Sequence, residues 1–231
     1  GPAVDFAHPE LLIRAAQALP GRLSALAVGP GLGTESTSAS LLAAALERNV
    51  PLLLDADALN LSGADPTLKH ALAARTAPTV LTPHPAEAAR MLGTDTASVQ
   101  ADRLHAALEI AAQYRALVVL KGCGSIVASP DGRWFINGTG HPGMASAGMG
   151  DVLTGLIVGL LAQGWPAESA LIAGVHLHGA AADRLAREGI GPIGLTASET
   201  IDAARGVFNG WLIEAQRDPR LAGAAPLRGG R

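Results

Sequence analysis

The 231-residue chain has little cysteine, few aromatic side chains and no long apolar run. Its one cysteine, Cys123, excludes an internal disulfide and a cysteine-rich zinc site, and it fits a reducing cytoplasm. Aromatic residues make up only 3% of the chain, which argues against a platform for stacking nucleic-acid bases. The longest apolar stretch, residues 152–162, is shorter than the roughly 20 residues that span a bilayer. We therefore expect no nucleic-acid partner and no membrane partner.

The chain also lacks a large excess of charge of either sign. Its 17 Lys and Arg and 20 Asp and Glu give a formal net charge of only −3. Proteins that bind a nucleic-acid backbone usually carry a basic face, so this balance argues against that class again. Hydrophobic residues reach 48%, which is enough for a sizeable core. The length allows one large domain or at most two small ones, and no linker is visible.

The two ends of the chain differ from the rest in composition. The opening Gly1-Pro2 is typical of the remnant that a specific protease leaves on a recombinant chain. The last residues are rich in Pro, Gly and Arg, which favours a frayed terminus. We expect a single domain over residues 3–217 and a disordered tail over residues 218–231.

Apolar and turn residues alternate in a way that predicts short strands between helices. Continuous apolar runs such as residues 52–54 and 118–120 are typical of strands buried on both faces. Repetition of strand, loop and helix predicts an α/β fold, whose mostly parallel sheet is covered by helices on both faces. The predicted strands span residues 23–28, 51–54, 79–81 and 117–120, and the predicted helices span residues 9–19, 38–48, 66–74, 85–92 and 98–115.

The pattern changes after residue 120. Residues 125–129 and 133–136 predict a β-hairpin, because Asp131-Gly132 between them is a strong turn signal. A glycine-rich loop over residues 137–150 follows. Further helices are predicted over residues 151–163 and 167–188, and the capping-box spacing of Thr196 and Glu199 predicts the start of a last helix.

Four polar or glycine-rich segments follow the predicted parallel strands. They cover residues 29–33, 55–60, 82–87 and 121–125. The carboxyl ends of parallel strands share one edge of a sheet, and ligands of open α/β sheets bind beyond that edge. The topology alone therefore predicts a site where these segments meet.

A fifth segment, residues 143–151, opens a predicted helix. Gly148 and Gly150 allow backbone N–H groups to converge at the helix N-terminus, where an anion is favoured. Asp151 beside such a site suits a base that takes a proton from a hydroxyl while the N–H groups hold a transferring phosphoryl group. The alternative is that Asp151 only caps the helix and the glycines only permit a turn.

The segment after the strand at residues 117–120 is a second candidate for phosphate binding. Lys121 can neutralise a phosphate, and the glycines at 122 and 124 admit a ligand closely. An ordinary lysine at a strand end is the alternative. Cys123 is expected to be a small buried residue rather than a nucleophile.

The histidines and the remaining acids leave alternatives open. His84 stands between two prolines, which would present its imidazole rigidly, although it can equally be a turn residue without function. His176 and His178 are two residues apart, which does not suit a metal site on one helix face. Two interpretations stay open for Asp55 and Asp57: either they bind a metal or a ligand, or they only mark the end of a strand.

Gly155 and Gly159 are spaced four residues apart within the apolar run. This spacing indicates close packing between helices in a core. A membrane dimer with such spacing would need a longer apolar run.

Taken together, the segments resemble the ADP/ATP-dependent NAD(P)H-hydrate dehydratases. The resemblance runs from about Val28 to Glu199, and it rests on residues 29–33, 54–60, 81–87, 120–122 and 142–155 in the family's order. The combination of Pro-His-Pro at 83–85 with Gly-Met-Gly-Asp at 148–151 is the specific part. The family has a ribokinase-like fold, so the resemblance implies that fold, with the β-hairpin before the catalytic loop.

The resemblance implies a metabolite-repair lyase. The family removes water from (6S)-NADHX and (6S)-NADPHX, which are hydrated at C6 of the nicotinamide ring, and restores NADH and NADPH. It phosphorylates the 6-hydroxyl and then eliminates phosphate. The resemblance also implies Mg²⁺, a phosphoryl donor that is ADP or ATP, and a homo-tetramer. The Gly-Met-Ala-Ser run at residues 143–146 resembles that of bacterial members, which favours ADP as the donor.

The resemblance also implies roles for residues of this sequence. Asp151 would be the base on the 6-hydroxyl, and the backbone at Gly148 and Gly150 would hold the phosphoryl group. The hydrate would contact Gly33, His84 and Asp151, and no protein metal ligand is implied. The nucleotide would contact Lys121, Gly122, Cys123, Gly124, Ser125 and Gly150.

The sequence departs from the family in a few places. His141, Ala147 and Ser125 stand where Asn, Gly and Thr are common. The family's basic, glycine-rich N-terminal strand–loop–helix unit has no counterpart here, and a missing strand would expose a sheet edge and open the substrate pocket. Two alternatives therefore stay open: another ribokinase-like kinase of a small alcohol, and a truncated nucleotide-binding module without turnover.

Overall fold

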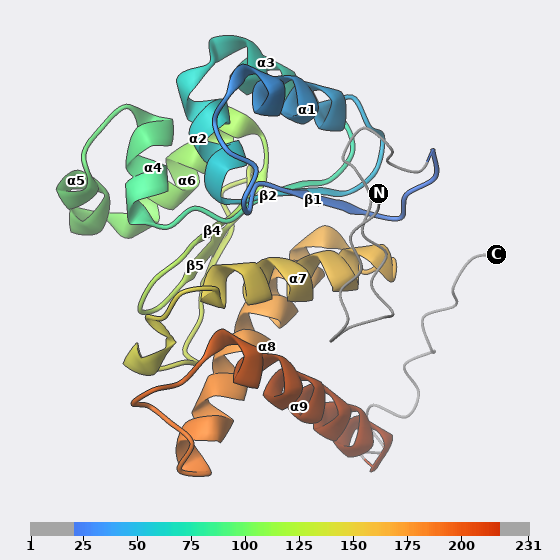
Figure 1. Ribbon diagram of the computed structural model, residues 1–231, viewed down its shortest axis with the longest axis vertical. Coiled ribbons are helices and arrows are strands. Elements are labelled where there is room, and N and C mark those ends of the chain that lie inside the picture. The colour runs from blue at the N-terminus through green and yellow to red at the C-terminus, as the bar shows by residue number, and fades with distance from the viewer. Residues whose placement is uncertain (1–20, 218–231) are drawn as a thin grey trace.

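A six-stranded sheet forms the centre of the computed structural model, which describes residues 21–217 (Figure 1). The strands follow one another across the sheet in chain order. The first four are parallel, and the last two form an antiparallel hairpin on β4. They are β1 (Leu26–Val28), β2 (Leu52–Leu54), β3 (Thr79–Leu81), β4 (Leu117–Leu120), β5 (Ile126–Ala128) and β6 (Trp134–Ile136).

Helices cover both faces of this sheet, as the sequence predicts (Figure 1). One face carries α1 (Ser36–Leu46), α2 (Ala56–Ala64), α3 (Pro66–Ala73), α4 (Pro85–Leu92), α5 (Thr96–Ala101) and α6 (Arg103–Tyr114). The other carries α7 (Met149–Ala162) and α8 (Ala167–Arg187), with α9 (Ala197–Arg217) packed on them.

Alternation along each strand divides the core into two layers. Successive side chains of a strand point to opposite faces of the sheet. In β2, Leu52 and Leu54 join the core under the first helix layer, whereas Leu53 joins the core under α7 and α8. Both layers are apolar, which explains why the central strands are continuous hydrophobic runs. The prediction of strands buried on both faces is confirmed for residues 52–54 in β2 and residues 118–120 in β4.

Strand β1 differs from that prediction. Its three residues are only partly buried, because within the described residues β1 lies at the edge of the sheet and pairs only with β2. The strand expected over residues 23–28 is also shorter, since pairing covers only Leu26–Val28.

Three helical regions differ from the prediction in detail. Helix α2 occupies most of the segment that the sequence marked only as polar. The single helix expected over residues 98–115 is two helices, because Asp102 interrupts it and its carboxylate caps α6 by accepting the His105 N–H at 2.9 Å. The glycine-rich loop contains a short 3-10 helix, η2 (Pro142–Met144).

The remaining helix predictions agree closely with the structure. The last helix begins with the expected capping box, in which the Thr196 N–H donates to Glu199 Oε2 at 2.9 Å. The helix expected over residues 9–19 and the tail over residues 218–231 lie outside the described residues.

The close packing predicted at Gly155 and Gly159 is wrong for the described part of the chain. A Cβ atom at either position would meet nothing within 4 Å there. The tight contact between α7 and α8 lies instead at Gly174, where a Cβ atom would stand 2.7 Å from Cγ1 of Ile157.

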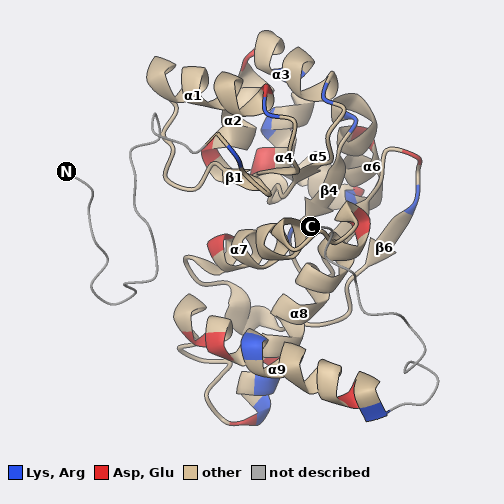
Figure 2. Cartoon of the chain, turned by 90° about the vertical axis from the view of Figure 1, so that its right-hand side faces the viewer, with Lys and Arg blue, Asp and Glu red and all other residues tan. Residues whose placement is uncertain are grey.

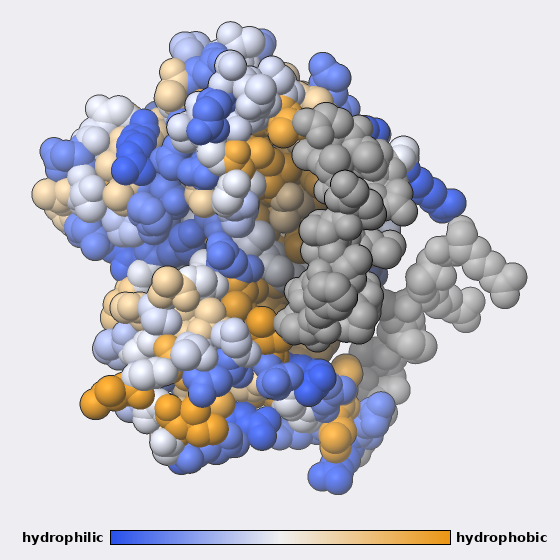
Figure 3. Space-filling view, viewed as in Figure 1, coloured by the Kyte–Doolittle hydropathy of each residue, from blue (hydrophilic) through white to orange (hydrophobic). Residues whose placement is uncertain are grey.

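The surface agrees with the mixed charge of the sequence. Basic and acidic residues are interspersed over the helices in Figure 2. Apolar atoms protrude at the loop between α8 and α9 (Figure 3), where Ile190 and Ile193 are 45% and 94% exposed. Within residues 21–217, no helix is long and apolar enough to cross a membrane.

Candidate active site

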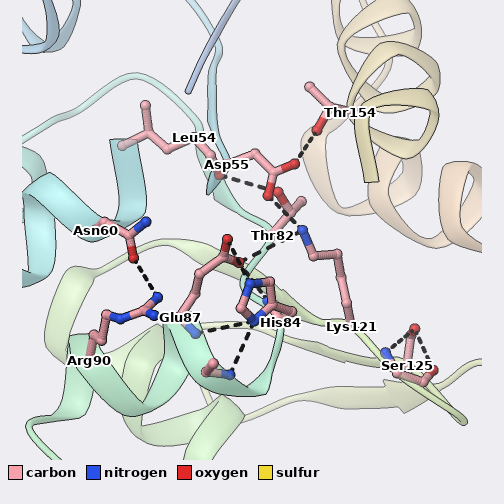
Figure 4. A network of polar contacts seen from close by, with 12 residues as sticks. Leu54, Asp55, Asn60, Thr82, His84, Glu87, Arg90, Lys121, Ser125 and Thr154 are labelled. Carbon is pink, nitrogen blue, oxygen red and sulfur yellow. Dashed lines mark hydrogen bonds and ion pairs between the residues drawn. The ribbon is translucent and has the colours of Figure 1, made fainter. Parts of the chain in front are cut away.

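A network of charged and polar side chains lies at the carboxyl ends of the strands (Figure 4). Asp55 follows β2 and is only 1% exposed. Its Oδ1 accepts a hydrogen bond from Lys121 Nζ at 2.7 Å, and its Oδ2 accepts one from Thr154 Oγ1 at 3.0 Å. Glu87 Oε2 lies 3.8 Å from the same Nζ atom. The network therefore joins the ends of β2 and β4 to α4 and α7.

His84 has a structural task at this edge as the N-cap of α4. Its Nδ1 accepts the N–H groups of Ala86 at 3.1 Å and Glu87 at 3.3 Å, and its own N–H donates to Glu87 Oε2 at 2.8 Å. Pro85 follows as the first helical residue, where its missing N–H costs nothing. The imidazole is held rigidly, as the flanking prolines predict, and it is still 47% exposed.

The charge of Glu87 is stabilised by its neighbours. Burial acts to raise the pKa of the Glu87 carboxyl, but the hydrogen bond with His84 and the charge of Lys121 outweigh it. The net result is a pKa below the ordinary value for glutamate. The Lys121 ammonium thus lies between two buried carboxyl groups, those of Asp55 and Glu87.

The first glycine loop lies against the same edge. A Cβ atom at Gly29 would stand 1.7 Å from the Asp55 carbonyl oxygen, so only glycine fits there. The Gly33 N–H donates to Asp57 Oδ2 at 2.8 Å. All four segments that the topology predicted to meet therefore do meet, and Asp57 serves as a partner of the loop.

The N-terminus of α7 faces this network. Gly148 is its N-cap with φ of 84°, a left-handed conformation that favours glycine, and no side chain within residues 21–217 caps the helix. The first N–H groups of a helix have no partner within it, so they are available to an anion. A Cβ atom at Gly150 would lie 3.4 Å from Lys121 Nζ. The lysine ammonium and the positive end of the helix dipole are therefore adjacent.

A cavity of about 730 Å³ opens beside this helix end. Its wall includes seven of the predicted site residues: His84, Lys121, Gly122, Cys123, Gly124, Ser125 and Gly150. Gly33, Gly148 and Asp151 are not part of that wall. Asp151 is exposed in the first turn of α7, directly after Gly150.

Cys123 is exposed, so the expectation that it is a buried residue is wrong. It stands in the turn between β4 and β5, between Gly122 and Gly124. Both glycines have positive φ, 146° and 64°, and all three residues line the cavity. The thiol thus belongs to the rim of the cavity rather than to the packed interior.

Arg103 is a residue that the motifs did not reveal. From the first turn of α6 it donates hydrogen bonds to the carbonyl oxygens of Leu120 at 3.2 Å and Lys121 at 3.3 Å, and to that of Cys123 at 2.5 Å. It therefore fixes the backbone of the turn that carries Lys121. A lone arginine at a helix start carries no local signal of this role.

His178 is the second such residue, on the α8 side of the cavity. It is 7% exposed, and its Nε2 atom has no hydrogen-bond partner among the described residues. Burial lowers the pKa of His178 to about 4, so the ring is neutral at pH 7. Val175, three residues earlier on α8, also belongs to the cavity wall. This spacing of three residues is the signal in the sequence that places both side chains on one face of the helix.

The described residues contain no group of three His, Cys, Asp or Glu side chains that could hold a metal ion. Hard divalent cations such as Mg²⁺ often take only one or two protein ligands together with substrate phosphates and water. The donor set of this site is compatible with an ion that arrives on a phosphate chain.

The comparisons with known proteins first define the class. A ribokinase-like superfamily protein from Enterococcus faecalis has a similar structure, with a TM-score of 0.67 and 27% identity over 81% of this chain and 63% of that chain. The α/β architecture is thus ribokinase-like, as the family resemblance implies.

A family model described as NAD(P)H-hydrate dehydratase matches residues 5–203. The chain is 46% identical to the ADP-dependent (S)-NAD(P)H-hydrate dehydratase of Neisseria meningitidis, over 90% of this chain and 71% of that protein. The crystal structure of the ADP/ATP-dependent enzyme of Bacillus subtilis, co-crystallised with ATP/Mg²⁺, has a TM-score of 0.76 and 34% identity over 85% of this chain and 68% of that chain. This chain belongs to the NAD(P)H-hydrate dehydratase family.

Longer relatives match as well. The bifunctional NAD(P)H-hydrate repair enzyme of Moorella thermoacetica is 48% identical over 164 residues, which are 71% of this chain. They are only 30% of that enzyme, so the present chain corresponds to one part of it.

Proposed function

We propose that this chain restores NADH and NADPH from (6S)-NADHX and (6S)-NADPHX with ADP as phosphoryl donor. The observation that supports this most directly is the uncapped N-terminus of α7, with Lys121 beside it and the cavity in front of it. Backbone N–H groups, a helix dipole and an ammonium stabilise the charge of a phosphoryl group in transfer. Family membership directs that chemistry to the nicotinamide hydrate.

In the proposed reaction, Asp151 takes the proton of the 6-hydroxyl group. The hydroxyl oxygen forms a bond to the terminal phosphorus of ADP, and the bond from that phosphorus to the bridging oxygen breaks to release AMP. The C6–O bond then breaks and phosphate leaves with its electron pair, while a proton passes from the neighbouring ring carbon C5 to water and the C5–C6 double bond re-forms. A general base contributes about 10²–10⁴-fold to such a rate.

The backbone at Gly148 and Gly150 holds the transferring group in this proposal. Gly33 and His84 contact the hydrate. The exposure of the rigid His84 imidazole at the cavity supports that assignment. The Gly33 N–H is already occupied by Asp57, so a contact between Gly33 and the hydrate would use the other backbone atoms of this glycine.

The nucleotide occupies the 730 Å³ cavity in this proposal. Its phosphates lie at Lys121, Gly122, Ser125 and the start of α7. Leu153 on α7 offers an apolar wall to the nucleoside. Mg²⁺ enters on the phosphates and neutralises their charge. The choice of ADP over ATP rests on the glycine segment of this sequence and on the name of the Neisseria relative.

We also propose a homo-tetramer that works in the cytoplasm. Large apolar side chains left exposed on the described surface support an assembly, including Trp134, Phe135 and Ile136 of the edge strand β6 at 46%, 42% and 59%. Light scattering on the purified chain measures the assembly, and a monomer at micromolar concentration would contradict it.

The decisive experiment follows the absorbance of reduced nicotinamide. The chain is mixed with the S hydrate of NADH, Mg²⁺ and either ADP or ATP, with the R hydrate as matched control substrate. Recovery of NADH from the S hydrate with ADP is expected. Recovery only with ATP would overturn the donor assignment, and no recovery with either nucleotide would favour a binding module without turnover.

A further inference from the structure

We propose that Asp55 is a positioning residue that, fixed by Thr154, aims the Lys121 ammonium at the phosphates of the bound nucleotide. The inference rests on the proposed nucleotide site and adds to it a pair of residues outside the cavity wall. It is carried by the geometry of the three side chains in Figure 4.

The first step is that the Asp55 carboxylate is held at both of its oxygens. Its side chain is 2% exposed, and each oxygen has one partner from a different element. Lys121 reaches Oδ1 from the end of β4, and the Thr154 hydroxyl reaches Oδ2 from the second turn of α7. Both partners donate, which is the arrangement that an ionised carboxylate needs.

The second step is that Lys121 needs such a partner. A lysine side chain has four rotatable carbon–carbon bonds and a compact charge, so ordering it costs conformational entropy. Glu87 Oε2 is 3.8 Å from Nζ, beyond a hydrogen bond, whereas Asp55 Oδ1 is at 2.7 Å. Asp55 therefore fixes the direction of the ammonium.

The third step is where that direction leads. A Cβ atom at Gly150 would lie 3.4 Å from Nζ and 3.7 Å from Asp55 Oδ2, so the ammonium stands at the first turn of α7. An ammonium has three donors, and the bond to Asp55 uses one. The others can serve a phosphate held at the helix N-terminus. Thr154 lies three residues beyond Asp151 on the same helix, which ties the position of Lys121 to that of α7.

The test uses Thr154→Val, which keeps the shape of the side chain and removes its hydroxyl, and Thr154→Ser, which restores it. Calorimetry gives the dissociation constants of ADP and of adenosine with Mg²⁺ and again in EDTA. We expect Thr154→Val to weaken ADP binding by about three- to tenfold, the range of one net hydrogen bond, in both buffers. Adenosine binding stays unchanged, and Thr154→Ser binds ADP like the wild type.

Three results would overturn the proposal: unchanged ADP binding in Thr154→Val, equal weakening of ADP and adenosine, or weakening that vanishes in EDTA. The second would indicate a general structural defect, and the third a carboxylate that acts on the metal rather than on Lys121. If Thr154→Val does not fold by thermal melting, Asp55→Asn is measured in the same way and is expected to weaken ADP binding at least as much.

The outcome is separable from the proposed function. A wild-type chain that binds ADP but does not restore NADH would contradict the proposed reaction and leave the role of Asp55 standing. A wild-type chain that binds no ADP would contradict both.

Discussion

At the scale of single residues, the candidate site contains two acids in different environments: Asp55, which is buried and paired with Lys121, and Asp151, which is exposed. Asp55 and Lys121 lie within the network and hold each other, whereas Asp151 is exposed at the start of α7 and has room to meet a substrate hydroxyl. Both acids stand near the same helix end, but only Asp55 has its oxygens occupied by described neighbours. This difference in engagement supports Asp151 as the base and Asp55 as a positioning residue.

The substitution Asp151→Asn tests the base assignment. It keeps the size of the side chain and removes its ability to accept a proton, so turnover is expected to fall by about 10²–10⁴-fold. ADP binding stays near that of the wild type, because the N–H groups and Lys121 remain. Steady-state kinetics and calorimetry measure the two quantities. Asp202→Asn, the same change at an exposed position on α9, is the matched control. Near-normal turnover in Asp151→Asn would remove the assignment.

At the scale of elements, the site depends on how α7 begins. The left-handed Gly148 and the bare Gly150 bring an uncapped helix end next to the strand ends. Helix α4 at the same edge is closed by the His84 and Glu87 capping box. Of α4 and α7, only α7 leaves its first N–H groups without a side-chain cap among the described residues. Helix α2, which begins directly after β2, has no side-chain cap either.

The substitution Gly150→Val tests the role of that helix start. A β-branched side chain would crowd the Lys121 ammonium and displace a phosphoryl group from the N–H groups, since a Cβ atom alone already stands 3.4 Å from Nζ. The loss of one such donor costs about 2.7–4 kcal/mol, or roughly 10²–10³-fold in turnover. Gly155→Val, on the same helix where a Cβ meets no described atom within 4 Å, controls for helix propensity. Equal rates in both variants would contradict the proposed anion site.

At the scale of the whole molecule, the sheet divides two apolar layers, and buried polar groups such as Asp55, Thr82 and Glu87 gather near the carboxyl ends of the strands. His178 lies away from these strand ends, on α8, and is buried with a neutral ring. Its burial links folding stability to pH, because the unfolded chain binds a proton at His178 that the folded chain binds only near pH 4.

The sign of this linkage gives a stability prediction. Below the ordinary histidine value of about 6.5, the unfolded state binds more protons, so the free energy of unfolding falls as pH falls towards the folded pKa of about 4. Between pH 6.5 and 5 the contribution of His178 falls by about 2 kcal/mol. Denaturant unfolding at these two pH values measures the difference. His178→Asn is expected to reduce it, whereas His105→Asn, at an exposed position, leaves it unchanged. An equal pH dependence in all three proteins would contradict the prediction.

Local signals in the sequence are enough to predict the α/β class, the central strands and the edge at which the site forms. Continuous runs such as residues 52–54 and the Asp131-Gly132 turn are local signals, because burial on both faces and hairpin geometry act over a few residues. Helix α2 and the break at Asp102 were missed, because short polar segments have no strong period and a cap depends on one side chain.

Which side chains meet at that edge, in contrast, depends on how distant segments pack together. Asp55 and Lys121 are 66 residues apart, and Asp55 and Thr154 are 99 apart, so no spacing in the sequence records their hydrogen bonds. The exposure of Cys123 and the orphaned nitrogen of His178 also follow from backbone turns and helix packing. Such contacts depend on the positions of separate elements around the sheet, and those positions are set by the packing of the two core layers as a whole.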